Sequence, residues 1–180
     1  MHAAPCRTLE PPAIPAQQAT DRHSSRPDGG LARFNTAPSA AAEALLLTCC
    51  GSHRWAERVT AHRPYPTLDA LLAAADEAGY DLRRADLAEA LARETPAPPH
   101  PDAPPAARTA LGAALAAYEA RFGHAFVISL DGVPEGERLD QVLAAIRSRL
   151  GNEREEERVV AAEELRRLAR TRLTCSIQTR

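Results

Sequence analysis

Lysine is absent from this sequence, and aromatic residues are scarce. All 22 basic residues among the 180 are arginine, and aromatic side chains make up only 4% of the chain. We interpret the absence of lysine as a coding bias rather than as a functional feature. The 22 basic residues stand against 24 acidic ones, which gives a net charge of -2. Because no excess positive charge draws the chain to polyanions, the composition argues against nucleic acid and anionic membranes as partners.

Long apolar runs are absent as well. The best run, Ala40 to Cys50, is short and contains Glu43, whereas a membrane-spanning helix needs roughly 18 to 20 apolar residues. The first thirty residues carry proline, arginine and glutamate where the apolar region of a signal peptide would lie. We therefore expect a cytoplasmic protein that does not enter a membrane.

Cysteine is too sparse and too unevenly spaced for a disulfide framework or a zinc site. The four cysteines are Cys6, Cys49, Cys50 and Cys175, and their spacing matches neither arrangement. We expect Cys49 and Cys50 to be small apolar residues near a helix end, and we expect no metal site.

The residues that are abundant favour helices. Alanine, leucine, glutamate and arginine lose little side-chain freedom in a helix, and a chain of 180 residues suits one domain. Leu111, Leu115, Tyr118 and Phe122 recur at the spacing of one helix face. Similar patterns along the chain predict an all-α fold, a compact single-domain bundle of about seven helices.

Local sequence signals set the expected boundaries. Residues 1–32 hold several prolines and a Gly-Gly pair without lasting periodicity, which predicts a disordered N-terminal tail. A helical domain is expected over 33–174, with a short C-terminal tail over 175–180. We expect Asn35 or Thr36 to cap the first helix, Ser52 and Thr67 to begin later ones, and Asn152 to cap the last. We expect Gly123 to end the helix that contains Leu111 to Phe122. Six of the ten residues 96–105 are proline, which predicts a loop.

Several strings in the sequence occur together in one known family. They are Cys50-Gly51-Ser52-His53-Arg54-Trp55-Ala56, Arg63-Pro64-Tyr65, His100-Pro101-Asp102, Tyr118-Glu119-Ala120-Arg121-Phe122-Gly123-His124-Ala125-Phe126-Val127-Ile128, Arg149-Leu150-Gly151-Asn152, and the run Glu164 to Leu173. In order and position they resemble the decarboxylases that convert 2-oxo-4-hydroxy-4-carboxy-5-ureidoimidazoline (OHCU) to S-allantoin in urate degradation. The string from Tyr118 to Ile128 is close to the family's Tyr-x-x-Lys/Arg-Phe-Gly-x-x-Phe signature.

The resemblance implies a compact helical fold, often dimeric, that needs no metal or organic cofactor. It implies that His100 is the catalytic acid/base, with Pro101 beside it. It also implies that Arg172 binds the substrate anion, a role that suits a planar guanidinium. The backbone of one short segment is implied to contact the small-molecule substrate, and its residues are Phe126, Val127, Ile128, Ser129 and Leu130.

One departure from the family lies after the His-Pro string. The family has a longer segment there with a Ser-x-x-Glu-Gln string, whose glutamate pairs with the histidine, whereas here Asp102 to Ala110 contains neither Glu nor Gln. Three alternatives follow. Another acid takes the place of the missing glutamate, with Asp102 the nearest candidate and Glu94 the second; or the reaction proceeds less efficiently without such an acid; or the activity is lost. We favour a divergent working enzyme. The alternatives are an inactive helical scaffold or subunit and, least favoured, nucleic-acid binding by the arginine-rich last helix.

Overall fold

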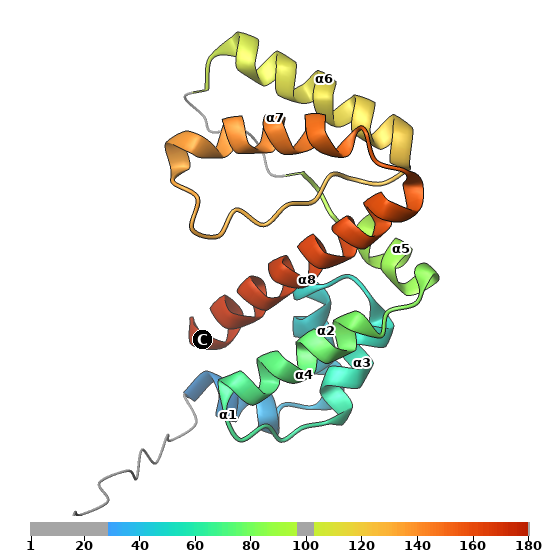
Figure 1. The fold of residues 1–180 in the computed structure, drawn as a ribbon. Coiled ribbons are helices and arrows are strands. Elements are labelled where there is room, and N and C mark those ends of the chain that lie inside the picture. Colours follow the sequence, from blue (N-terminus) through green and yellow to red (C-terminus); the bar gives the residue numbers. More distant parts are fainter. Residues whose placement is uncertain (1–28, 97–102, 180) are drawn as a thin grey trace, which may run out of the picture.

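The computed structural model describes residues 29–96 and 103–179 of the chain. The predicted tail up to residue 28 and the two loop residues His100 and Pro101 therefore lie outside the described residues. Within the described ranges the chain forms eight α-helices, one short 3₁₀ helix and no strand (Figure 1). The all-α prediction is confirmed, with one helix more than the approximate seven expected.

The helices follow one another along the chain, with longer connections before and after α6. They are α1 (Gly29–Thr36), α2 (Ser39–Cys49), α3 (His53–Ala61), α4 (Leu68–Tyr80), α5 (Arg84–Ala92), α6 (Pro105–Phe122), η1 (Glu135–Glu137), α7 (Arg138–Arg149) and α8 (Arg154–Gln178). None of these helices is long and apolar enough to cross a membrane.

The helical region is wider at both ends than the expected range 33–174. Helix α1 begins at Gly29 because Leu31 and Phe34 are buried in the core, so apolar contacts order a segment that shows no periodicity in the sequence. Helix α8 continues to Gln178, with Ile177 only 2% exposed. Asn35 does not cap a helix; its amide instead exchanges two hydrogen bonds with the backbone of Tyr65, at 2.8 and 2.9 Å.

Other local signals act as the sequence predicts. The side chains of Ser52 and Thr67 accept hydrogen bonds from the first turns of α3 and α4. Gly123 ends α6 with φ at 80°, a left-handed conformation that favours glycine.

The predicted cap of the last helix is wrong. Asn152 does not cap α8, because its side-chain amide donates to the Glu157 carboxylate at 2.8 Å instead.

The larger core forms where α1 to α5 pack against α8. Helix α8 runs through the middle of the molecule in Figure 1, with α6 and α7 on one side of it and α1 to α4 on the other. Its buried residues Ala161, Leu165, Ala169 and Leu173 recur every four residues, which gives one apolar stripe facing this core. Trp55 is buried in the same core, and its indole N–H donates to the Ala75 carbonyl at 2.8 Å.

A smaller core joins α6 to α7. Its buried members are Leu111, Tyr118 and Phe122 from α6, Ile146 from α7, and Phe126 from the segment between these helices. Figure 1 shows α6 and α7 side by side at one end of the molecule. The two cores are therefore built from different sets of helices.

The segment 124–130 lies between the two cores as an extended chain without a strand partner. Successive side chains of an extended segment point to opposite sides. Phe126 and Ile128 accordingly belong to the smaller core, and Val127 belongs to the larger one. From its residues alone, the apolar, β-branched run Phe126 to Leu130 fits either an extended segment or a helical turn, and the structure has the extended form.

A buried ion pair fixes this segment. Arg149, at the end of α7, donates to the Glu157 carboxylate through Nε at 2.9 Å and to the Val127 carbonyl through Nη1 at 2.7 Å. Its guanidinium also lies 4.5 Å from the centroid of the Phe126 ring. Glu157 is fully buried, and it accepts a further hydrogen bond from the Tyr118 hydroxyl. Burial, together with this hydrogen bond to Glu157, raises the pKa of Tyr118, so the hydroxyl stays protonated and donates.

We predict that Arg149→Met lowers the free energy of unfolding by about 3–5 kcal/mol, because the substitution leaves the Glu157 carboxylate buried and unpaired. Urea denaturation followed by far-ultraviolet circular dichroism measures this loss. The double variant Arg149→Met with Glu157→Leu should recover part of it, since no unpaired charge then remains. A single variant within about 1 kcal/mol of the wild type would show that the pair does not hold the two cores together.

Candidate active site

A small cleft opens where the extended segment meets α6, α7 and α8. The cavity has a volume of about 90 Å³. It is lined by Glu94, Thr95, Pro96, Leu111, Leu115, Phe126, Val127, Ile128, Leu130, Val142, Leu168 and Arg172. Most of these side chains are apolar, and Glu94 and Arg172 are the only ionisable ones among the described lining residues.

The cleft brings together most of the site residues predicted from the sequence. Four residues of the 126–130 segment line it, and Arg172 reaches it from α8. The fifth residue of the segment, Ser129, does not line the cleft, and its backbone N–H donates to the Glu164 carboxylate at 2.7 Å. His100 and Pro101 lie outside the described residues, although the described chain stops at Pro96, which is part of the cleft wall.

Arg172 is held by two acceptors. Its Nη1 and Nη2 donate to the two carboxylate oxygens of Glu94 at 2.7 and 2.8 Å, and Nη1 also donates to the Cys49 carbonyl at 3.1 Å. The Glu94 side chain is only 7% exposed, whereas that of Arg172 is 37% exposed. Hydrogen bonding to Glu94 raises the pKa of Arg172 above its usual value, so the guanidinium remains charged.

The sequence did not indicate that Glu94 pairs with Arg172. From the sequence, Glu94 is only the second candidate for the acid that pairs with His100, whereas in the structure it accepts hydrogen bonds from Arg172. The two residues are 78 positions apart, so no helix periodicity connects them.

Two further side chains missed by the sequence hold the cleft wall in place. Glu164 binds the Ser129 amide, and Thr171 donates through its hydroxyl to Asp131 just after the segment. Together with the hydrogen bond from Arg149 to Val127, these contacts tie the backbone of the wall to α7 and α8. The Ser129 N–H and the Val127 carbonyl are therefore already used within the protein.

The arrangement can bind a small planar anion and shield it from water. Apolar side chains on α6, α7 and the extended segment lower the local dielectric constant, which strengthens the interaction of an anion with the guanidinium. Nothing among the described lining residues is placed to transfer a proton at neutral pH other than the Glu94 carboxylate, which the guanidinium already engages. A separate acid/base group is needed for proton transfer.

Comparison with known protein families supplies the identity of this helical domain. The family model described as OHCU decarboxylase matches residues 35–97 and 93–174, which together span most of the chain. The chain belongs to the OHCU decarboxylase family. The two matched ranges overlap at residues 93–97, where the proline-rich segment begins.

Solved structures of OHCU decarboxylase relatives show the same fold. One structure described as OHCU decarboxylase in the presence of (S)-allantoin has a TM-score of 0.63 and 21% identity, covering 74% of this chain and 96% of that chain. A structure described as (S)-allantoin synthase has a TM-score of 0.64 and 21% identity, covering 81% of this chain. This chain spans about half, 53%, of that second protein. A comparison with curated proteins found no match.

The buried cysteines next to Arg172 give a prediction for thiol chemistry, because Arg172 donates to the Cys49 carbonyl and Cys50 is the next residue. Cys50, which follows α2, is buried, and burial raises its pKa to about 11, whereas Cys175 is exposed. Because alkylation requires the thiolate, iodoacetamide at neutral to weakly alkaline pH should label Cys175 and leave Cys50 unmodified in the folded protein. Peptide mass spectrometry measures both rates. Labelling of Cys50 as fast as that of Cys175 would contradict the burial of Cys50.

Proposed function

We propose that this chain catalyses the cofactor-free decarboxylation of OHCU to S-allantoin, with Arg172 binding the substrate anion and His100 acting as acid/base. Membership of the OHCU decarboxylase family supports the reaction class. The observation that carries the proposal is the cleft itself, which gathers Arg172 and four residues of the 126–130 segment around one cavity. The homodimer and the cytoplasmic location expected from the sequence remain predictions.

Arg172 keeps donors for a substrate although Glu94 is bound to it. A guanidinium has five N–H groups, and the three hydrogen bonds to Glu94 and Cys49 use both on Nη1 and one on Nη2. The Nε–H and the second N–H of Nη2 remain, and they lie on one edge of the guanidinium. Two parallel donors on one edge suit a carboxylate. Glu94 thus orients the guanidinium, and the substrate carboxylate binds the free edge.

The chemistry requires little from the protein beyond orientation and one proton. The bond from the ring carbon to the carboxylate breaks, carbon dioxide leaves, and the electron pair passes into the ring's imine-like system. A proton is then delivered to one face of the ring, which sets the S configuration. Imidazole titrates near neutral pH and suits this transfer. His100 follows Pro96 of the cleft wall by four residues in the sequence.

An inactive scaffold of the same fold is the second candidate. The observation that favours it is the two-point pairing of Glu94 with Arg172, which neutralises the only described cation in the cleft. The absence of the Ser-x-x-Glu-Gln segment also favours an inactive scaffold. This alternative predicts a folded protein that binds a partner without turnover, and the kinetic experiment below separates it from the enzyme.

We predict that the wild-type chain forms S-allantoin from OHCU faster than the spontaneous background, and that His100→Ala returns the rate to that background. OHCU is generated in place by urate oxidase and its hydrolase partner, and circular dichroism follows the chiral product. His62→Ala is the matched control, because His62 is an exposed histidine at the end of α3 outside the cleft. It should keep wild-type activity.

Racemic product at the background rate from a folded wild-type chain would exclude the enzyme and leave the scaffold. An active His100→Ala variant would instead show that another group transfers the proton.

We also predict that Arg172→Lys raises KM about tenfold or more with a smaller change in kcat, because an ammonium group does not present two parallel donors to a planar carboxylate. Arg170→Lys on the same helix is the matched control, since Arg170 pairs with Asp76 and does not line the cleft. Steady-state kinetics of both variants, with melting curves to verify folding, measure the effect. Equal KM values for the two variants would remove Arg172 from substrate binding.

A further inference from the structure

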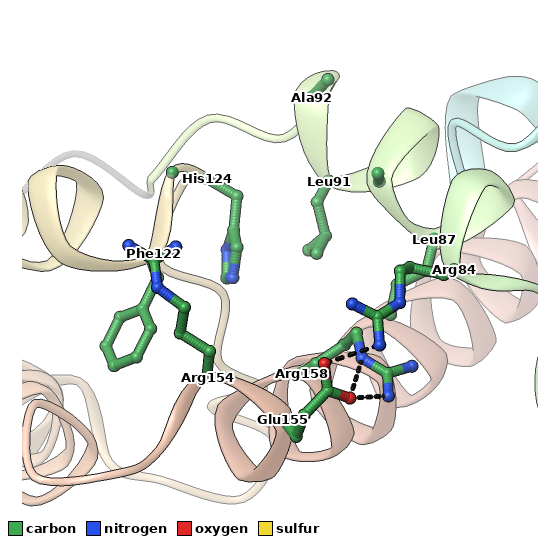
Figure 2. A pocket seen from close by; sticks show the side chains of 11 residues that line it. Arg84, Leu87, Leu91, Ala92, Phe122, His124, Arg154, Glu155 and Arg158 are labelled. Carbon is green, nitrogen blue, oxygen red and sulfur yellow. Dashed lines mark hydrogen bonds and ion pairs between the residues drawn. The ribbon is translucent and has the colours of Figure 1, made fainter.

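A larger cavity lies apart from the cleft, between α5, the end of α6 and the first turn of α8 (Figure 2). Its volume is about 290 Å³, close to the lower end of the range of roughly 300–1,000 Å³ in which ligand pockets fall. Arg154 here and Arg172 in the cleft are 18 residues apart on α8, which places them about 27 Å apart along the helix. The cavity is therefore a separate site that the decarboxylation does not use.

One wall of this cavity is apolar. It is formed by Leu87 and Leu91 from α5 and by the Phe122 ring from α6, with the small side chains of Ala88 and Ala92 leaving room beside them. The His124 ring also lines the cavity and lies at 33° to the Phe122 ring. A wall of this kind favours a flat apolar body, which gains from leaving water and from contact with aromatic rings.

The polar side of the cavity is positively charged. Three arginines, Arg84, Arg154 and Arg158, face it with a single carboxylate, Glu155, so three positive charges stand against one negative charge. Figure 2 shows Arg154 and His124 on one side of the space and Arg84 and Arg158 on the other. This charge excess is local, because the chain as a whole has a net charge of -2.

Glu155 orders two of these arginines without occupying all their donors. It accepts from Arg84 Nη2 at 2.6 Å and from Arg158 Nε at 3.0 Å. Hydrogen bonding to Arg158 lowers the pKa of Glu155, so the carboxylate is charged at neutral pH. Arg154 makes no hydrogen bond or ion pair with any residue in the described part of the chain. An arginine without a partner beside two ordered ones provides donors for an incoming anion.

We propose that this cavity binds a small molecule that carries a phosphate or carboxylate group on a flat apolar body. The anionic group lies among the three arginines, and the apolar body lies against Leu87, Leu91 and Phe122. Guanidinium groups bind both anions through paired N–H donors. Because Arg84 and Arg154 are exposed and Arg158 is partly exposed, their attraction for the anion falls with added salt, whereas the apolar contact does not.

The test is isothermal titration calorimetry of the full chain at constant ionic strength with two pairs of probes. Phenyl phosphate is compared with inorganic phosphate, and benzoate is compared with acetate. In at least one pair the aromatic probe should bind about tenfold more tightly than its bare head group, because it adds a buried ring. The pair that shows this gain identifies the head group as phosphate or carboxylate.

Variants then locate the binding site. Arg154→Gln should weaken the aromatic probe about fivefold or more through loss of a charged donor, and Ala88→Glu should abolish binding by filling the apolar wall with a carboxylate. Arg33→Gln is the matched control, since Arg33 lies in α1, whose Gly30 abuts Ile177 at the other end of α8. It should bind like the wild type. Arg154→Gln should also keep full decarboxylase activity, which separates this site from the proposed reaction.

Three results would overturn the proposal. The first is equal affinity for both members of each probe pair, which means that no apolar wall contributes. The second is an equal loss of binding in Arg33→Gln and Arg154→Gln, which means that only the overall charge matters. The third is a loss in Arg172→Lys with none in Arg154→Gln, which assigns the probe to the cleft.

Discussion

The buried pair of Arg149 and Glu157 is the interaction on which the rest of the structure depends. The pair lies where α7, α8 and the extended segment meet, and each of the two residues also makes hydrogen bonds to other groups. Arg149 holds the Val127 carbonyl, and Glu157 accepts from Tyr118 and Asn152. The extended segment has no strand partner, so these polar contacts replace the hydrogen bonds that a sheet would supply. Because the segment forms one wall of the cleft, the geometry of the cleft depends on this pair.

A second ion pair, between Glu94 and Arg172, sets the chemistry of the cleft. A lone guanidinium in an apolar cleft loses much of its hydration, and a carboxylate partner compensates for that loss. Two-point pairing through one edge also stops the guanidinium from rotating. The nearest described acid therefore pairs with Arg172, whereas His100 lies outside the described residues.

The sequence predicted the features that are encoded locally. Ser52 and Thr67 cap their helices and Gly123 ends α6 as expected, because each depends on residues within one turn. Four residues of the segment from Phe126 to Leu130 lie around one cleft with Arg172, and their roles in substrate binding remain predictions. Contacts between distant residues could not be predicted. Asn152 binds Glu157 instead of capping α8, and α1 is ordered by burial of Leu31 and Phe34 rather than by a periodic pattern. The pairing of Glu94 with Arg172 depends on how α5 and α8 pack together.

A crystal structure of the chain soaked with (S)-allantoin, the proposed product, tests the catalytic cleft most directly. We expect the ligand to lie in the cleft, with one face against Phe126 or Ile128 and with a polar group on the free edge of Arg172, while Glu94 stays bound to the other edge. Density for His100 within hydrogen-bond distance of the ring would complete the proposed site. Allantoin bound only in the cavity between α5 and α8, or a cleft that stays empty at saturating concentrations, would contradict the assignment of the cleft as the catalytic site.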